Sequence, residues 1–563
     1  MIQWRRYGFA FATCSVALGA GTLSCGTTVA GSSRPVLERD PRLASAAPSK
    51  SLPARPREAR TTPSRDQSPS SGAVASSTSA IARSPTASAL PDEGPREAPP
   101  PPVAEARIAA IGPHVFIWPK PNRKRGVALG NIRMGTSVRV RDPGPVAGPG
   151  CARGYVGVVP RGYVCLDHRT TLDLDDPYVR ALADVAPRPD ALYPFDYAYS
   201  RGAPMYSRVP SPEEWRRAER RLGPPGQYLE LGAWAAGHEE LLAPDEPIRA
   251  RDAVPWYFAG GRRHVGGGTR EPRRLVWKTI PNGSMLAYAK AFAMHGRVWL
   301  VTPDLTLVPA DRVQRIERTA FAGVALGASV SLPLGWNRTK KPQPLFRRTE
   351  DGGFEATGET IGPKAWVEIG RPAVGPSDDR YHPLRARPGV YLRARHSTFT
   401  WPRRQRPAAI REGEKWIDAR IGPGTLTAYR GLEPVYATLF SPGKGGAPVP
   451  GLDHTKYATT QTGYFRFEWK ERVATMSNEP GEPKILWFSD VPHIQYIRAP
   501  LALHVAYWHA DYANPKSAEC VNVSPRDGAW LFSFTDPPLP EGWGAVRPGG
   551  GFGRSTPIMI NGM

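Results

Sequence analysis

The sequence has few cysteines and lacks the spacings that hold metal ions. Its 563 residues include five cysteines, and neither a CxxC nor an HExxH pattern occurs. Cysteine or histidine pairs at those spacings are the usual ligands of zinc sites. We therefore expect no metal centre, and each cysteine needs an explanation of its own.

The sequence also lacks a hydrophobic run long enough to span a membrane. A basic pair, Arg5-Arg6, precedes an apolar run from Phe9 to Leu23, which is shorter than a membrane-spanning helix. This pattern predicts an export signal over residues 1–30. Leu23-Ser24-Cys25 approximates a lipoprotein cleavage box with Cys25 as the lipidated residue, and Thr28-Val29-Ala30 offers an ordinary cleavage site instead. Both alternatives place the mature protein outside the cytoplasm, in the periplasm or cell envelope, with a lipid anchor as its one link to a membrane.

Large apolar side chains are scarce between residues 31 and 105, which are rich in Ser, Pro, Ala and Arg. Such a segment cannot bury enough surface to offset the entropy lost on ordering. We therefore predict a disordered tether with a root-mean-square reach of roughly 50 Å.

Helical periodicity is scarce in the rest of the chain, which is long enough for about two to four domains. Short apolar alternations broken by turn residues predict a mostly β fold. One exception is the segment 211–215, Ser-Pro-Glu-Glu-Trp, where a capping box with proline at the first helical position predicts a helix.

Residues 106–172 resemble a small bacterial SH3-like barrel, with strands expected at 114–118, 137–140 and 155–159. Cys151 and Cys165 close a 15-residue loop in this window. In an oxidising compartment a disulfide between them would contribute about 3 kcal/mol.

Residues 173–410 form a β-rich accessory region in which further SH3-like modules are one interpretation. Segments 297–301 and 365–369 have strand patterns. The region either binds glycan or peptide, or serves as a structural spacer, and the sequence leaves both open.

One free cysteine remains. Cys14 leaves with the export signal, Cys25 is the candidate lipid site and Cys151 pairs with Cys165, so Cys520 stays free. A lone cysteine is more often an inert core residue, but a free thiol in an exported protein is most simply a nucleophile.

The histidines nearest in sequence to Cys520 are His504 and His509. The stretch they share with Cys520 resembles the catalytic loop of the L,D-transpeptidase (YkuD-type) family, whose pattern is His-Gly, a variable loop, then Ser/Thr-x-Gly-Cys-x-Asn. On this resemblance His504 is the proton donor and acceptor and Cys520 the nucleophile, with Ser517 and Asn522 at the flanking polar positions. His509 is the rival base, or a residue that packs at the edge of Trp508.

The resemblance extends over about 140 residues. Segment 460–465 matches the family's Thr-Pro-x-Gly-x-Phe, with Gln461 in place of the proline, and segment 527–532 matches the short helix that follows the nucleophile. It implies a β-sandwich catalytic domain over residues 411–550, opened by strands at 415–420, 425–429 and 435–441.

The family chemistry is transfer of a peptidoglycan stem-peptide acyl group, without a cofactor. Cys520 would attack the donor tetrapeptide and expel the terminal D-alanine, and an acceptor amine would resolve the thioester into a cross-link. Backbone N–H groups around Cys520 would stabilise the oxyanion.

Two positions depart from the family pattern. Val505 replaces the glycine after the first histidine, and Ala518-Glu519 replaces the pair before the nucleophile, often His-Gly. Glu519 brings a Cβ and a negative charge beside a sulfur that must itself become negative. The alternative function is therefore a wall-binding protein that keeps the fold with impaired catalysis.

The formal net charge is +23. A basic surface can indicate a nucleic-acid partner, but export and the lack of a nucleic-acid motif argue against one. A basic surface would also concentrate the protein on anionic wall polymers, and a genome-wide preference for arginine is the other explanation.

Overall fold

The computed structural model describes residues 105–142, 144–189, 191–222, 240–243, 246–265, 274–374, 379–477 and 486–562. The chain divides into two compact units, Met1–Ala98 and Pro99–Met563, and every described residue belongs to the second. The predicted export signal, Cys25 and all but the last residue of the predicted tether lie outside the described residues. In the described ranges, no helix has the length and apolar character needed to cross a membrane.

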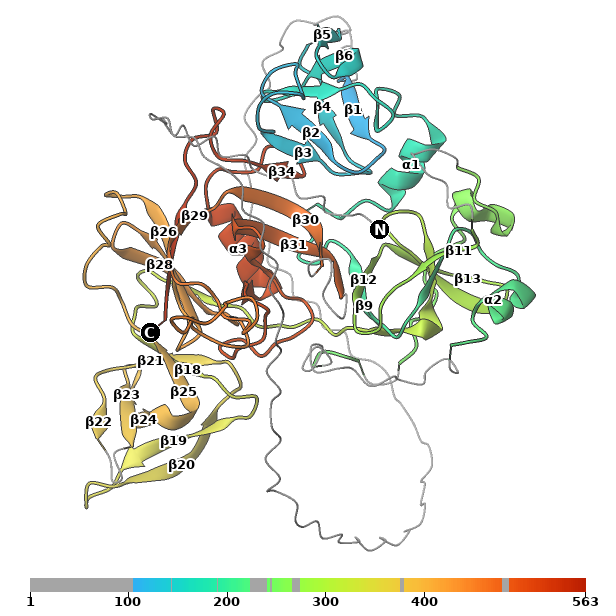
Figure 1. Cartoon of the computed structure of the whole chain (residues 1–563). Helices are drawn as coiled ribbons and strands as arrows, with labels where there is room; N and C mark the ends of the chain where they lie inside the picture. The colour runs from blue at the N-terminus through green and yellow to red at the C-terminus, as the bar shows by residue number, and fades with distance from the viewer. Residues whose placement is uncertain are drawn as a thin grey trace, which may run out of the picture. The chain divides into compact units, whose positions relative to one another are not determined.

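The second unit is mostly β, as the sequence predicts (Figure 1). Its first module contains eight strands around a core that includes Ile108, Ile117 and Val138. A disulfide joins Cys151 to Cys165, whose Cα atoms lie 5.7 Å apart. The strands are β1 (Arg107–Ala110), β2 (Val115–Trp118), β3 (Gly130–Ile132), β4 (Ser137–Arg139), β5 (Val146–Gly148), β6 (Cys151–Gly157), β7 (Tyr163–Cys165) and β8 (Thr170–Thr171), followed by helix α1 (Pro177–Asp184).

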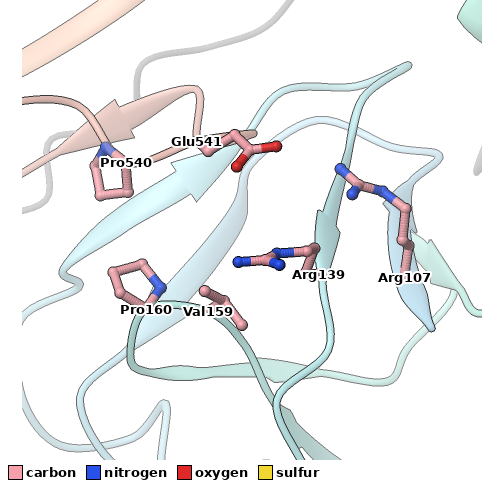
Figure 2. Close-up of a pocket in the computed structure, with 6 residues that line it drawn as sticks. All are labelled: Arg107, Arg139, Val159, Pro160, Pro540 and Glu541. Carbon is pink, nitrogen blue, oxygen red and sulfur yellow. The ribbon is translucent and has the colours of Figure 1, made fainter. Parts of the chain in front are cut away.

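The C-terminal segment completes this first module. Strand β34 (Ala545–Val546) pairs with β3, and Trp543 is buried in the module's core. The indole Nε1 of Trp543 donates a hydrogen bond to the Val159 carbonyl oxygen at 2.9 Å. A cavity of about 220 Å³ lies where the segment returns. In Figure 2, Arg107, Arg139 and Glu541 surround this space above Val159 and Pro160.

The second module follows α1, and its core includes Tyr206, Trp299 and Leu307. Helix α2 (Pro212–Ala218) has the predicted capping box, in which the Ser211 hydroxyl accepts from the Glu214 backbone N–H. The other elements are β9 (Asp196–Ser200), β10 (Pro204–Tyr206), β11 (Val276–Thr279), β12 (Met285–Tyr288), β13 (Lys290–Met294), β14 (Arg297–Val301), β15 (Leu307–Pro309) and β16 (Val313–Arg315), with 3₁₀ turns η2 (Trp256–Gly261) and η3 (Ala310–Arg312).

The third module resembles the second in its ending, because in each a 3₁₀ turn leads into the last strand. Its core includes Leu345, Ile369 and Leu392. Its strands form a three-stranded sheet, β21-β18-β25, and a five-stranded sheet, β20-β19-β24-β23-β22. They are β18 (Leu334–Asn337), β19 (Gln343–Arg348), β20 (Phe354–Ile361), β21 (Trp366–Glu368), β22 (Ala373–Val374), β23 (Arg380–Leu384), β24 (Arg387–Arg393) and β25 (Ser397–Thr400), with turn η5 (Ala394–His396) before β25. The SH3-like interpretation of these modules stays a prediction.

The C-terminal region contains two sheets that share one core. One has the order β17-β28-β27-β26-β35-β29, and the other contains β30 to β33. Leu426 from the first sheet, Leu503 and Val521 from the second, and Leu531 from helix α3 meet in the core. The elements are β17 (Val324–Ala325), β26 (Lys415–Arg420), β27 (Thr425–Arg430), β28 (Glu433–Leu439), β29 (Gly463–Arg466), β30 (Trp469–Ser477), β31 (Trp487–Arg498), β32 (Leu501–Val505), β33 (Val521–Val523), α3 (Pro525–Phe534) and β35 (Pro557–Asn561).

The last strand, β35, lies beyond residue 550, the predicted end of this region. It runs parallel to β26 and antiparallel to β29, so the sheet is complete only when the chain returns from the first module. The predicted strands at 415–420 and 425–429 correspond to β26 and β27, and the predicted helix at 527–532 lies within α3. Figure 1 shows α3 lying against the β30–β31 hairpin.

Candidate active site

The predicted catalytic residues come from two neighbouring parallel strands. In the register of β32 and β33, Leu503 lies opposite Val521 and His504 opposite Asn522. Cys520 immediately precedes β33. Because strand side chains alternate between faces, Leu503 and Val521 enter the core while His504 and Asn522 share the other face. The Ala502 backbone N–H, two residues before His504, lies beside the Cys520 sulfur.

Cys520 is partly buried, and its sulfur lies 3.7 Å from the Pro500 carbonyl oxygen. The pKa of the Cys520 thiol is raised to about 12, mainly by burial and in smaller part by the charge of Glu519, while the Ala502 backbone N–H acts in the opposite direction. The sulfur is therefore a neutral thiol at physiological pH. A base must remove its proton before the sulfur can act as a nucleophile.

His504 has the protonation state that such a base requires. Burial lowers the pKa of its imidazole to about 4, so the ring is neutral near pH 7. Its Nδ1 lies 2.9 Å from the Val505 carbonyl oxygen. A carbonyl only accepts, so Nδ1 carries the proton and Nε2 keeps the lone pair. The carbonyl of Val505, a position that the sequence singled out only for lacking glycine, therefore orients the base.

His509 makes a different set of contacts. It is fully buried, and its ring centroid lies 5.3 Å from that of Tyr512 and 6.3 Å from that of Trp508. Its Nε2 is 3.4 Å from Nδ2 of Asn522. These contacts favour the aromatic-packing interpretation over the role of base, and they give His509 a part in positioning Asn522.

The segment before Cys520 is fixed by hydrogen bonds to its backbone. The Ser517 hydroxyl donates to the Cys520 carbonyl oxygen at 2.6 Å. The Thr460 hydroxyl donates to the Glu519 carbonyl oxygen at 2.7 Å and accepts from the Gly443 N–H. The predicted residue Ser517 and the matched segment 460–465 thus meet at the cysteine.

The backbone of Gly443 pairs with Ser517 of this segment and packs closely against the loop at Ala458. A Cβ at Gly443 would lie 2.2 Å from the Ala458 carbonyl oxygen, so a side chain there would push the supporting loop away. Sequence reasoning missed Gly443, as well as the Ala502 N–H beside the sulfur, because backbone contacts depend on the fold and have no motif of their own.

Glu519 is buried, with its side chain 8% exposed, and one carboxylate oxygen lies 3.8 Å from Nδ1 of His454. The carboxylate therefore points toward His454 and is largely shielded from solvent. The charge of Glu519 raises the pKa of Cys520, which is the direction that the sequence predicts, and the cost to catalysis stays a prediction.

No protein-family model and no curated protein matches this sequence. Among solved structures, the chain is similar to an L,D-transpeptidase from Xylanimonas cellulosilytica, at 19% identity and a TM-score of 0.19, over 28% of this chain and 64% of that one. It is similar to an L,D-transpeptidase from Mycobacterium smegmatis, at 19% identity and a TM-score of 0.20, over 39% and 77%. It is also similar to the catalytic domain of the E. faecium L,D-transpeptidase, at 18% identity and a TM-score of 0.19, over 26% and 97%. The match therefore spans less than two thirds of the first of these structures.

Proposed function

We propose that this protein is a peptidoglycan L,D-transpeptidase that uses Cys520 as the nucleophile and His504 as the proton acceptor and donor. The observation that carries the proposal is the pairing of β32 with β33, which brings Cys520, the residue before β33, next to the strand that holds His504. The His504 ring is neutral and is oriented by the Val505 carbonyl. The catalytic-loop motif supports the same assignment.

The proposed reaction starts from a neutral pair. The thiol proton of Cys520 moves to Nε2 of His504 as the sulfur attacks the donor carbonyl carbon, and a tetrahedral oxyanion forms. When the C–N bond breaks, His504 returns the proton to the leaving amine of D-alanine, and a thioester remains on Cys520. An acceptor amine then attacks the thioester, loses a proton through His504 and forms the cross-link, which restores the thiol.

Because the thiol and imidazole are both neutral at rest, the proton transfer carries part of the activation barrier. The Ala502 N–H favours the developing thiolate, and Glu519 opposes it. The proposed enzyme would therefore be slower than one with glycine at position 519. Ser517 and Asn522 would act by holding the loop and the strand that carry the nucleophile.

The second candidate function is a wall-binding protein with impaired catalysis. The buried carboxylate of Glu519 beside the thiol favours it. In this alternative, the three β modules would contact glycan or stem peptides and the sulfur would stay protonated. The proposals of export, of lipid anchoring at Cys25 and of SH3-like modules apply equally to both candidates.

Imipenem, which is bound in a solved L,D-transpeptidase structure, offers a direct test. The purified protein would be incubated with imipenem and its intact mass measured, with Cys520→Ala as the control. A mass increase in the parent that is absent from Cys520→Ala supports the transferase. An unmodified parent whose Cys520 is still alkylated by iodoacetamide supports the wall-binding alternative.

A further inference from the structure

The third module contacts the segment that connects His504 to Cys520. Residues 511–514 of this segment contact Arg338, which directly follows β18, and Lys364, which lies just before β21. The sequence predicts either glycan or peptide binding, or structural spacing, for this part of the chain. A direct contact with the catalytic segment suggests a further role.

Lys364 is the centre of the contact. Its side chain is 8% exposed. The ammonium Nζ donates to the Tyr512 carbonyl oxygen at 2.7 Å, to Oδ1 of Asp511 at 3.0 Å and to the Arg338 carbonyl oxygen at 2.6 Å. All three N–H groups of the ammonium therefore have an acceptor, two in the catalytic segment and one in the third module.

Neighbouring groups extend the same junction. The Arg338 guanidinium donates to the Ala513 carbonyl oxygen and to Oδ1 of Asn514, both at 3.2 Å. The Asn514 amide donates to Oδ1 of Asp511 at 2.6 Å. Trp336 and Leu334 of β18 share a buried cluster with Tyr512 and Ala513.

The conformation of the segment depends on outside support. Ala513 has a φ of 73°, in the left-handed region that is unfavourable for a residue with a Cβ. The turn at Gly424 approaches Ala513 so closely that a Cβ there would lie 2.5 Å from the Ala513 Cα. A short segment without its own regular structure keeps such a shape only when its surroundings fix it.

The same segment leads directly to the nucleophile. Ser517, whose hydroxyl holds the Cys520 carbonyl, follows Tyr512 by five residues, and its N–H donates to the Pro442 carbonyl oxygen. The Ser441 hydroxyl donates to the Asp511 carbonyl oxygen, and the Ser441 backbone pairs with Asn522. Movement of residues 511–514 would therefore be transmitted to both sides of Cys520.

We infer that Lys364 is a positioning residue for Cys520, and that the third module serves to hold the His504-to-Cys520 segment in its reactive conformation. The inference extends the proposed function by giving an accessory module a part in the same site. It depends on the transferase activity only for the kinetic part of its test.

The test compares Lys364→Met with Lys290→Met. Lys290 lies 3.0 Å from Asp184 in an ion pair that is remote in sequence from the catalytic segment, which makes it a matched control. Amide hydrogen exchange of residues 511–519 and the rate of imipenem acylation at Cys520 are measured for both variants, together with thermal unfolding. Loss of a hydrogen bond donated by a charged group should raise the local rate of amide exchange by about tenfold or more.

We expect Lys364→Met to accelerate exchange in residues 511–519 and to slow acylation, while Lys290→Met changes neither. Lys364→Arg should restore part of the exchange protection. If Lys364→Met does not fold, Asp511→Asn tests the same contact from the other side. Unchanged exchange in residues 511–519, whatever the melting temperature, would overturn the inference. A parent that imipenem does not acylate refutes the proposed function alone, because the exchange measurement still decides the role of Lys364.

Discussion

Replacement of Glu519 separates the effect of its charge from the effect of its side chain. The Cys520 thiol has its pKa raised to about 12, with burial as the main cause and Glu519 as a further one. Glu519→Gln keeps the size of the side chain and removes the charge, so the pKa should fall while burial holds it above its ordinary value.

The expected magnitude follows from the thiolate fraction. One pKa unit corresponds to about 1.4 kcal/mol, and below the pKa each unit gives about tenfold more thiolate. Glu519 contributes less than burial, so we expect Glu519→Gln to raise the rate of Cys520 alkylation at pH 8 by up to about tenfold. Glu519→Gly should raise it further, since glycine also frees the backbone beside the sulfur.

Iodoacetamide is a suitable reagent, since its reaction with a thiol needs no catalytic base and reports thiolate directly. The pH dependence of the second-order rate constant gives the pKa for the parent and for each variant. Glu433→Gln, which removes an exposed carboxylate on β28, is the control. Equal rates for the parent and Glu519→Gln would show that the carboxylate does not act on the sulfur, and the electrostatic reasoning would fail.

Three further predictions concern the base, a buried histidine and the disulfide. His504→Ala should slow imipenem acylation by about 10²- to 10⁴-fold, measured by mass spectrometry, since it removes the proton acceptor; a change of less than threefold would contradict this role. Burial lowers the pKa of His493 and of His504 to about 4, so the unfolded chain binds protons at pH 4 to 6.5 that the folded chain does not. The free energy of unfolding should therefore fall on acidification through this window, by up to about 1.4 kcal/mol per pH unit for each histidine. Urea unfolding of His493→Gln should show a shallower pH dependence than the parent, and an identical slope would refute the assignment. Replacing Cys151 and Cys165 with alanine should lower the stability of the first module by about 3 kcal/mol in denaturant unfolding; no change in the transition midpoint would exclude the disulfide as a stabilising link.

Sequence patterns were sufficient for the elements whose signals are local. The capping box at Ser211 gave helix α2, and alternating apolar residues gave β14, β26 and β27. The prediction that His504 and Cys520 act together needed the family motif, since 15 residues separate them in the sequence. Only the parallel pairing of β32 with β33 brings the two parts of the chain together.

The features that the sequence did not reveal depend on long-range contacts. Strand β35 completes the sheet of β26 after the chain has returned from the first module. The sequences of the short strands β34 and β35 do not indicate which strands they pair with. The Lys364 contact joins residues 147 positions apart. A lysine in a loop is ordinarily exposed to solvent, so nothing in the sequence indicates that Lys364 is buried against Asp511.

The most direct test of the central proposal is the reaction of the purified protein with a disaccharide-tetrapeptide. The assay follows D-alanine release and cross-linked dimer by mass spectrometry, with Cys520→Ala in parallel. The transferase proposal predicts dimer and free D-alanine from the parent and neither from Cys520→Ala. No product from the parent or from Glu519→Gly, while Cys520 stays open to alkylation, would contradict the proposal and leave the wall-binding alternative.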